Sequence, residues 1–394
     1  MMGLSVTGAG VEHGATYFEP GDHGGPVLIK VQRYFGGGTQ VTNPVVGVAV
    51  APPVPLPSVF HRYHEVINAS LRDRLSGDNS FVHSMLRYNM GWSDTDGTPV
   101  SATEGKAFRP TLCLLACEVV GGNYQHALPA AVALELIHNF SLIHDEIQDR
   151  DETRRHRPTL WAVWGDAKAL VAGNVLRVIA DSSLEQLLVA EVPFTDIVTI
   201  NGVITEACLE MIEGQYLDMA YEGRSDIGMK SYLDMIARKT GALIRSPMHV
   251  GAIIGTNDKS VIAAFRECGR ALGYVFQIRD DVLGIWGDHE TTGKPVGADI
   301  RRKKNSMPIV HAMSQADGVE KQALEHIYRQ EVVNDTDVDV VLNIMDGLGT
   351  RDHAHTLAAK HCDYGVESLE SIEMSPVARN DIEELAKFLL ERQH

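Results

Sequence analysis

The chain has 394 residues, enough for roughly two or three ordinary domains or for one large helical domain. Hydrophobic residues make up 44% of it, and 52 acidic against 35 basic side chains give a formal charge of −17. This charge argues against a nucleic-acid backbone or an anionic membrane surface as the main partner. An anionic small substrate would need local cations or metal ions to bind.

Five cysteines in so long a chain are too few and too scattered for a disulfide framework, which favours a reducing compartment. Cys113 and Cys117 stand one helical turn apart in an apolar run, and we expect core residues there and not zinc ligands. No apolar run approaches the ~18 residues of a membrane span, and the basic start of a signal peptide is missing. The expected location is cytoplasmic.

Residues 1–60 differ in composition from the rest of the chain. They hold 11 of the 36 glycines and 7 of the 16 prolines, a density of breakers through which no helical period persists. We interpret them as a mobile N-terminal extension. A small β-hairpin made from VLIKVQRYF and VVGVAVA is an alternative, because β-branched residues are frequent in both segments.

Residues 61–394 are predicted to form a single all-α domain. Apolar residues recur there at three- and four-residue spacing, with short interruptions by Gly, Pro or Asp. Three stretches, 130–149, 195–220 and 261–287, are apolar on nearly every side, which is typical of helices buried inside a bundle. No internal repeat of fixed period is apparent.

The first of these stretches ends in acids on one stripe. On an ideal helix His138, Asp145 and Asp149 fall within about 40° of one another. Carboxylates one turn apart in an apolar cavity repel each other unless hard cations such as Mg²⁺ neutralise them. An ordinary solvated helix end is the alternative for an isolated pair of this kind.

A second buried stretch repeats the pattern, with Gln277, Asp280, Asp281 and Gly284 on one stripe. Two apolar helices that both turn acidic at one end suggest a shared metal cluster. Candidate anion-binding residues surround them in the sequence: Lys106, Arg109, Arg154, Arg155, Lys239 and Lys294. Acid pairs that hold divalent ions, with separate cations outside them, suit the binding and ionisation of diphosphates. For residues 301–304, RRKK, pairing with surface acids is the alternative.

At this point the sequence resembles a known family. The motifs GKAFRP, LIHNFSLIHDEIQDRDETRRHRPT, ARKTGALI and FQIRDDVLGIWGDHETTGKPVGADI are similar, in order and spacing, to those of the trans-isoprenyl diphosphate synthases. This class includes the farnesyl and geranylgeranyl diphosphate synthases. The resemblance covers residues 80–310 and implies a large antiparallel helical bundle around a central cavity, the isoprenoid synthase fold, usually as a homodimer.

The resemblance also implies roles for individual residues. Three Mg²⁺ ions would be held by Asp145, Asp149 and Asp280, with Asp281 and Asp299 behind them. Allylic diphosphate would be bound by Arg154, Lys239 and Lys294, and isopentenyl diphosphate by Lys106, Arg109, His138 and Arg155. Thr240 and Gln277 match polar groups near the reacting carbons. Gln215 and Asp218 also match family positions, with either a direct or a structural role.

Three positions depart from the family pattern. Glu146 stands where a second aspartate is usual, at a position that need not contact metal. Gly284 stands where many relatives have aspartate, which removes one carboxylate. Glu104 replaces a glycine and adds a negative charge beside Lys106, which could weaken isopentenyl diphosphate binding.

Product length is predicted from the residues before Asp145. A single aromatic at the fifth preceding position, Phe140, followed by Ser141, resembles the pattern of enzymes that form the C20 product geranylgeranyl diphosphate. A helical wheel places Phe140 about 140° from Asp145, so geometry alone does not put it in the same cavity. We expect Phe140→Ala to lengthen the product.

Two other functions are compatible with these motifs. A terpene cyclase on the same fold is suggested by DDxxGxxxD at 280–288, but it would have no use for the isopentenyl diphosphate set of Lys106, Arg109, His138 and Arg155. A non-catalytic partner subunit of a prenyl synthase would not need two intact acidic motifs. The synthase is therefore the favoured interpretation.

Overall fold

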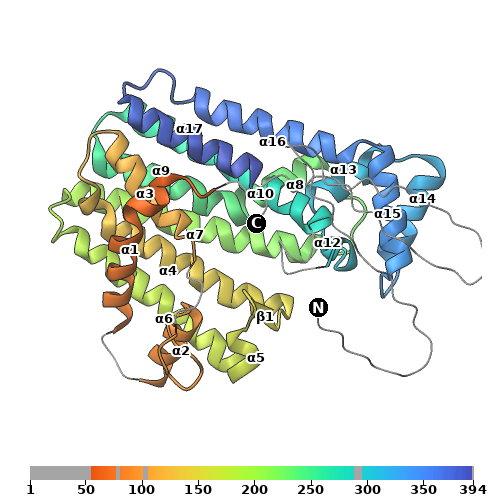
Figure 1. The fold of residues 1–394 in the computed structure, drawn as a ribbon, viewed down its shortest axis with the longest axis horizontal. Helices are drawn as coiled ribbons and strands as arrows, with labels where there is room; N and C mark the ends of the chain where they lie inside the picture. The colour runs from red at the N-terminus through yellow and green to blue at the C-terminus, as the bar shows by residue number, and fades with distance from the viewer. Residues whose placement is uncertain (1–54, 77–79, 101–104, 288–294, 393–394) are drawn as a thin grey trace, which may run out of the picture. The chain divides into compact units, whose positions relative to one another are not determined.

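The computed structural model describes residues 55–76, 80–100, 105–287 and 295–392. The predicted extension lies outside the described residues except for 55–60, and Ser58 already begins the first helix. The remaining described chain is almost entirely helical, which confirms the all-α prediction (Figure 1).

The first half of the chain contributes these elements: α1 (Ser58–Ser76), α2 (Phe81–Asn89), α3 (Phe108–Val119), α4 (Tyr124–Asp149), β1 (Thr153–Arg154), β2 (Arg157–Pro158), α5 (Leu160–Trp164), α6 (Asp166–Leu184), η1 (Glu185–Leu187) and α7 (Phe194–Tyr221). The second half contributes α8 (Met229–Ile236), η2 (Ala237–Gly241), α9 (Ala242–Gly255), α10 (Lys259–Trp286), α12 (Ala298–Arg301), α13 (Met307–Gln315), α14 (Gly318–Arg329), α15 (Asp335–Gly347), α16 (Thr350–Glu367) and α17 (Pro376–Glu391).

The core lies among the long helices that were predicted as buried. α4 packs against α3 and α6, while α10 packs against α9 and α16. Leu112, Leu134, Leu176 and Leu272 are fully buried there, as are Cys113 and Cys117, so the core interpretation of the two thiols is confirmed. A smaller apolar cluster joins α13, α14 and α15 to the end of α10.

α4 was predicted correctly as a central helix. Asn123 caps its start by accepting a hydrogen bond from the Gln125 amide at 3.0 Å, and Arg150 ends it in a left-handed conformation. In the part of the chain that the structure describes, α4 is the one helix long and apolar enough to cross a membrane. Most of its apolar window, 72%, is buried inside the bundle, as expected for a core helix.

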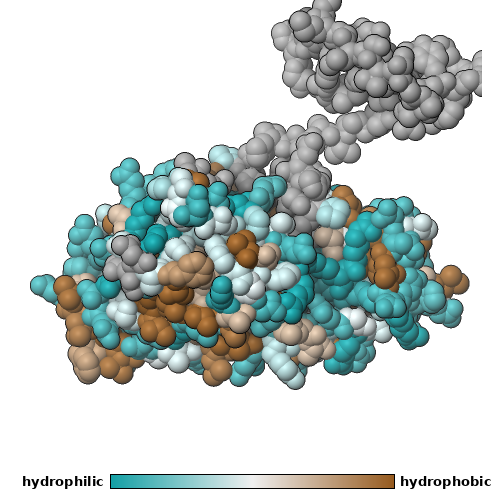
Figure 2. All heavy atoms as spheres, turned by 90° about the horizontal axis from the view of Figure 1, so that it is seen from below, coloured by the Kyte–Doolittle hydropathy of each residue, from teal (hydrophilic) through white to brown (hydrophobic). Residues whose placement is uncertain are grey.

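One face of the bundle is apolar and exposed. Side chains on α6, on α7 and in the segment between them lie largely open to solvent: Val171, Val178, Leu188, Val189, Phe194, Val198, Leu209 and Tyr216. Figure 2, viewed from the side of α6 in Figure 1, shows brown apolar residues gathered on part of this face. A patch of this kind marks an interaction surface.

Candidate active site

A cavity of about 640 Å³ opens among α3, α4, α7, η2, α10 and α17. Most of the residues predicted for the site line it: Lys106, Arg109, His138, Ser141, Asp145, Asp149, Arg154, Arg155, Lys239, Thr240, Gln277 and Asp280. They come from segments as far apart as residues 106 and 280, so the fold brings the separate motifs to one place. Lys294, Glu104 and Asp288 lie outside the described residues.

The acidic end of α4 forms one wall of the cavity. Burial, opposed by Lys239 and reinforced by Asp149, raises the pKa of Asp145 to about 6. His138 lies seven residues before Asp145 on the same stripe of α4. Burial, together with Arg109, Arg154 and Arg155, lowers the pKa of its imidazole well below the ordinary value. It is therefore neutral, and its Nδ1 is buried without a hydrogen-bond partner.

A short hairpin after α4 delivers two arginines. β1 and β2 pair Arg154 with Arg157, and the two turn residues between them, Arg155 and His156, both have positive φ, at 50° and 62°. This is the signature of a type I′ turn, which usually uses Asn or Gly. The sequence carried no such signal, and the hairpin was not predicted.

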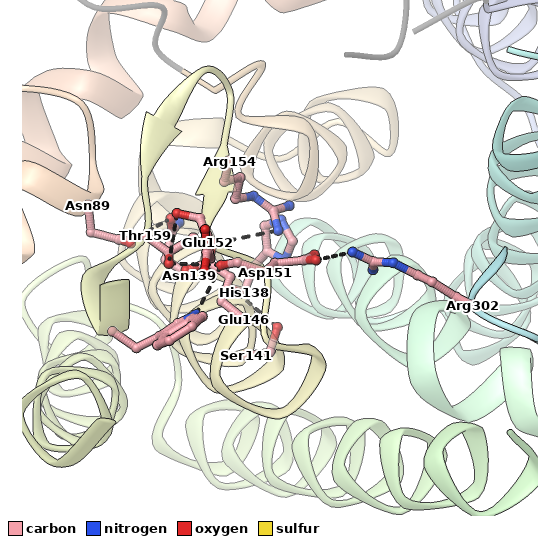
Figure 3. Close-up of polar contacts among 11 residues, drawn as sticks. Asn89, His138, Asn139, Ser141, Glu146, Asp151, Glu152, Arg154, Thr159 and Arg302 are labelled. Atoms are coloured by element: carbon pink, nitrogen blue, oxygen red, sulfur yellow. Dashed lines mark hydrogen bonds and ion pairs between the residues drawn. The ribbon is translucent and has the colours of Figure 1, made fainter. Parts of the chain in front are cut away.

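Figure 3 shows how the hairpin region is tied down. Asp151 receives hydrogen bonds on its carbonyl from the Thr159 hydroxyl at 2.8 Å and from Trp161 at 2.9 Å. Its carboxylate pairs with Arg302, which reaches across from the end of α12 (Figure 3). Arg302 therefore links the segment after α4 to the segment that follows α10.

Glu146, the first departure from the family pattern, lines the same cavity as Asp145 and Asp149. It is 4% exposed, and Arg154 Nη1 lies 3.7 Å from its Oε1 (Figure 3). Burial, opposed by Arg154, raises its pKa to about 7. The longer side chain thus pairs with an arginine of the hairpin, beside Asp145 and Asp149 in the same cavity.

A second group of cations lies on the α3 side. Arg109 is buried, and desolvation lowers its pKa to about 10 despite the nearby Glu135 carboxylate. Burial, then Arg392 and Arg155, also lowers the pKa of Lys106. Arg109 Nε and Glu135 Oε2 are buried without hydrogen-bond partners. Such orphaned groups mark a site shaped for a polar ligand.

Lys239 and Thr240 lie in η2, a five-residue π turn between α8 and α9. Turns of this type occur frequently at functional sites. Lys239 pairs with Asp218 of α7, and Gln215, one turn earlier on α7, donates to Gln148 at 3.0 Å. A Cβ placed on Gly214 would lie 2.1 Å from the Lys239 amide nitrogen, so α7 and η2 touch backbone to backbone.

The two aspartates that end α10 have separate environments. Asp281 is buried and accepts hydrogen bonds from Tyr232 (2.6 Å), Gln277 (2.7 Å) and the Met307 amide (2.7 Å). Burial and then Asp299 raise its pKa to about 7. Asp280 faces the cavity, and its Oδ1 accepts from Arg392 at 2.8 Å. Thr240 donates to Gln277, which connects η2 to Asp281.

Gly284 makes room for another carboxylate. A Cβ at this position would meet Asp299 Oδ2 at 2.3 Å. Asp299, which comes from α12 and lines the cavity, therefore occupies the space that a side chain at position 284 would need. The motif lacks a carboxylate at position 284, and Asp299 brings one to the same place from a different helix.

The four basic residues 301–304 divide in the structure. Arg301 pairs with Asp335 at 2.8 Å, as the surface alternative expected. Arg302, which pairs with Asp151, and Lys304 instead line the cavity. Burial alone would lower the pKa of Lys304, but Asp218, Asp299, Asp281 and Asp149 raise it overall. Its position in a basic run concealed this location.

Phe140 does not line the cavity. Its ring packs edge-on against His144, with centroids 4.6 Å apart. The apolar wall next to Asp145 is instead made by Ser141, Leu142 and Met211. The helical-wheel position of Phe140, away from the acidic stripe, is therefore the one the structure has.

The described residues do not bring three His, Cys, Asp or Glu side chains together as a complete metal cage. Mg²⁺ commonly needs only one or two carboxylates, because substrate phosphates and water fill its other positions. Asp145 and Asp149 on one wall and Asp280 on another offer hard oxygen ligands to such an ion. The donor set therefore fits Mg²⁺ that binds together with a diphosphate.

Comparison with known proteins identifies the family of the chain. Residues 98–345 match the family model for polyprenyl synthetase. The chain is 35% identical over 358 residues to the (2E,6E)-farnesyl diphosphate synthase of Mycobacterium tuberculosis, covering 90% of this chain and 94% of that protein. It is 37% identical over 258 residues to a geranylgeranyl diphosphate synthase of the same organism, covering 65% of this chain and 69% of that protein.

A solved structure agrees as well. The geranylgeranyl pyrophosphate synthetase of Pyrococcus horikoshii superposes with a TM-score of 0.76 at 35% identity, covering 85% of this chain and 98% of that one. The chain belongs to the polyprenyl synthetase family. It is a trans-isoprenyl diphosphate synthase, a prenyltransferase of isoprenoid biosynthesis.

Proposed function

We propose that this cavity condenses isopentenyl diphosphate with an allylic diphosphate in the presence of Mg²⁺, and that the main product is C20 geranylgeranyl diphosphate. The observation that carries the proposal is the division of the cations into two groups. Lys239, Lys304 and Arg154 lie beside the acidic helix ends, whereas Lys106 and Arg109 lie on the α3 side. Two diphosphates need two such groups.

The allylic diphosphate would bind at the acidic helix ends. Asp145, Asp149 and Asp280 would hold Mg²⁺, and the family resemblance implies three ions. This Mg²⁺ would supply positive charge to the departing diphosphate. Arg154 and Lys239 would stabilise the negative charge that develops as the allylic C1–O bond breaks. A cluster of fixed cations in a cavity does this without reorganisation at the moment of reaction.

Isopentenyl diphosphate would bind to Lys106, Arg109, Arg155 and neutral His138. Its double bond then forms the new carbon–carbon bond with the allylic C1, and the proton lost from C2 passes to the released diphosphate. The Thr240 hydroxyl and the Gln277 amide lie near the reacting carbons in this arrangement. No side chain needs to act as the general base.

The C20 product is supported by the cavity wall. Ser141 is small, and Phe140 is turned toward His144, so no aromatic side chain closes the wall next to Asp145 on α4. We expect Ser141→Phe to shorten the product to C15 because a ring would enter the space of the growing chain. Phe140→Ala, expected from the family pattern to lengthen the product, should instead leave chain length unchanged, because Phe140 packs against His144 outside the cavity lining. An unchanged product distribution in Ser141→Phe contradicts this gate.

The exposed apolar face on α6 and α7 supports a homodimer. Burying large apolar side chains such as Phe194 and Val198 against a second copy removes them from water, at about 25 cal/mol per Å². A cytoplasmic location is consistent with five buried cysteines that all remain as free thiols. Sedimentation of the purified protein tests the dimer directly.

One incubation tests the activity. Purified protein is given Mg²⁺, isopentenyl diphosphate and, in turn, dimethylallyl, geranyl or farnesyl diphosphate, and products are identified with and without phosphatase treatment. We expect geranylgeraniol to appear only after phosphatase. A hydrocarbon released without phosphatase would indicate a terpene cyclase, and absence of turnover with every primer would indicate a non-catalytic subunit.

A further inference from the structure

The last described residue of the chain, Arg392, lies inside the cavity. Its side chain is 8% exposed, although it follows the final helix by only one position. The guanidinium donates from Nη2 to Asp280 Oδ1 at 2.8 Å and to the Phe276 carbonyl at 3.1 Å. It also stacks over the Phe276 ring, 4.0 Å from the centroid. Arg392 is therefore held in a defined place.

The backbone of Arg392 is fixed as well. Its amide donates to the Phe388 carbonyl at 2.8 Å, and its own carbonyl accepts from Arg279 Nη2 at 2.8 Å. Arg279 and Asp280 are neighbours on α10, so this helix contacts both the main chain and the side chain of Arg392. The contact joins residues 112 positions apart in the sequence.

Arg392 also lies close to the second group of cations. It contributes to the lowered pKa of Lys106, after burial, and Lys106 Nζ stands 5.6 Å from the Phe388 ring of α17. A single guanidinium thus contacts a carboxylate proposed to hold metal and approaches a lysine proposed to hold isopentenyl diphosphate.

We propose that Arg392 is a positioning residue that pairs with Asp280 and competes with divalent cations for that carboxylate. The inference rests on the proposed function, because it takes Asp280 as a metal ligand. A guanidinium at hydrogen-bond distance neutralises the carboxylate and repels a second cation. Divalent cation binding at Asp280 therefore requires the pair to separate. The released guanidinium lies beside Lys106, where an anionic diphosphate would receive it.

The test measures binding of Mn²⁺, used as a paramagnetic probe, by electron paramagnetic resonance, with and without inorganic diphosphate. We expect Arg392→Gln to bind the Asp280-dependent Mn²⁺ about 3- to 30-fold more tightly than the wild type, because Asp280 loses its competing partner. A tenfold change in affinity corresponds to about 1.4 kcal/mol. Arg392→Lys, which keeps the charge, should remain close to the wild type. Arg329→Gln is the matched control, because Arg329 pairs with Glu325 on a distant helix.

Asp280→Asn identifies the relevant binding site. The Mn²⁺ signal that is lost in this variant is the one whose affinity is compared between Arg392→Gln and the wild type. An unchanged or weaker Mn²⁺ affinity in Arg392→Gln overturns the competition. The KM for isopentenyl diphosphate should rise in the same variant at saturating Mg²⁺, a response that loss of helix packing alone does not predict when the melting temperature is kept. Failure of the proposed function is seen separately, as absence of turnover in a wild type that still binds Mn²⁺.

Discussion

The two acidic helix ends carry similar sequence patterns but are used differently. Asp145 and Asp149 on α4 both face the cavity, and burial, with repulsion from Asp149, keeps the pKa of Asp145 high. On α10, Asp281 is buried among three donors and Asp280 is paired with Arg392. One end is therefore open to a ligand, whereas the other is already half neutralised by the protein. A pattern of acids predicts a site, but the neighbours decide which acid is available.

The largest expected effect comes from the open end. Asp145→Ala should abolish turnover, by at least about 10³-fold, because it removes an oxygen ligand where charge develops. The helical fold, followed by circular dichroism, should persist, since the side chain contributes no apolar burial. Asp226→Asn, at an exposed pair with Arg224, serves as the control. Retained activity in Asp145→Ala would remove the argument for a metal cluster at α4.

The next effect concerns η2, which lies between the two ends. Gly214→Ala should lower kcat by roughly 10- to 100-fold, because its Cβ would displace the Lys239 backbone and misplace a cation by a fraction of an ångström or more. Gly202→Ala, on the same helix with open space around it, should leave kcat unchanged and raise stability by about 0.5–1 kcal/mol. Equal kinetics in both variants would contradict the close packing.

A smaller effect is expected at the closed end. Gly284→Ala should reduce activity by about tenfold. The added methyl group would lie 2.3 Å from Asp299 Oδ2, so the carboxylate of Asp299 must move. Gly284→Asp, which restores the common family motif, should be no better than Gly284→Ala. Higher activity in Gly284→Asp would show that Asp299 does not take the place of the motif's missing carboxylate.

The smallest effect is on stability. Asp145 has a pKa of about 6 in the fold, above the ordinary value of about 3.9, so the folded protein binds its proton more tightly and loses stability as pH rises through this window. In metal-free buffer, Asp145→Asn should therefore be more stable at pH 7 by about 1–3 kcal/mol. The difference should vanish below pH ~4. Urea unfolding at both pH values measures it.

The sequence was most informative where helical periodicity applies. The stripe of His138, Asp145 and Asp149 could be predicted because all three lie on one regular helix whose apolar faces are easily recognised. The same geometry explains why Phe140 points away from the acidic stripe and packs against His144. The all-α fold was predictable for the same reason, since buried helices dominate the chain.

Contacts between distant segments could not be predicted in this way. Arg392 reaches Asp280 from the far end of the chain, and Asp299 enters the space at Gly284 from another helix, so no local pattern encodes either contact. Lys304 was hidden in a run of basic residues. The hairpin turn at Arg155 and His156 was missed because neither residue is a usual choice for positive φ.

The π turn makes the site sensitive to chain length as well as to side-chain identity. η2 inserts one additional residue where α8 runs into α9, and a regular α-helix would return if one residue of 237–241 were deleted. Because the π turn absorbs the extra residue locally, the flanking helices would keep nearly the same orientation, but the residues within 237–241 would shift by one position and Lys239 or Thr240 would leave the cavity. Residues that tolerate substitution in this segment therefore do not tolerate removal.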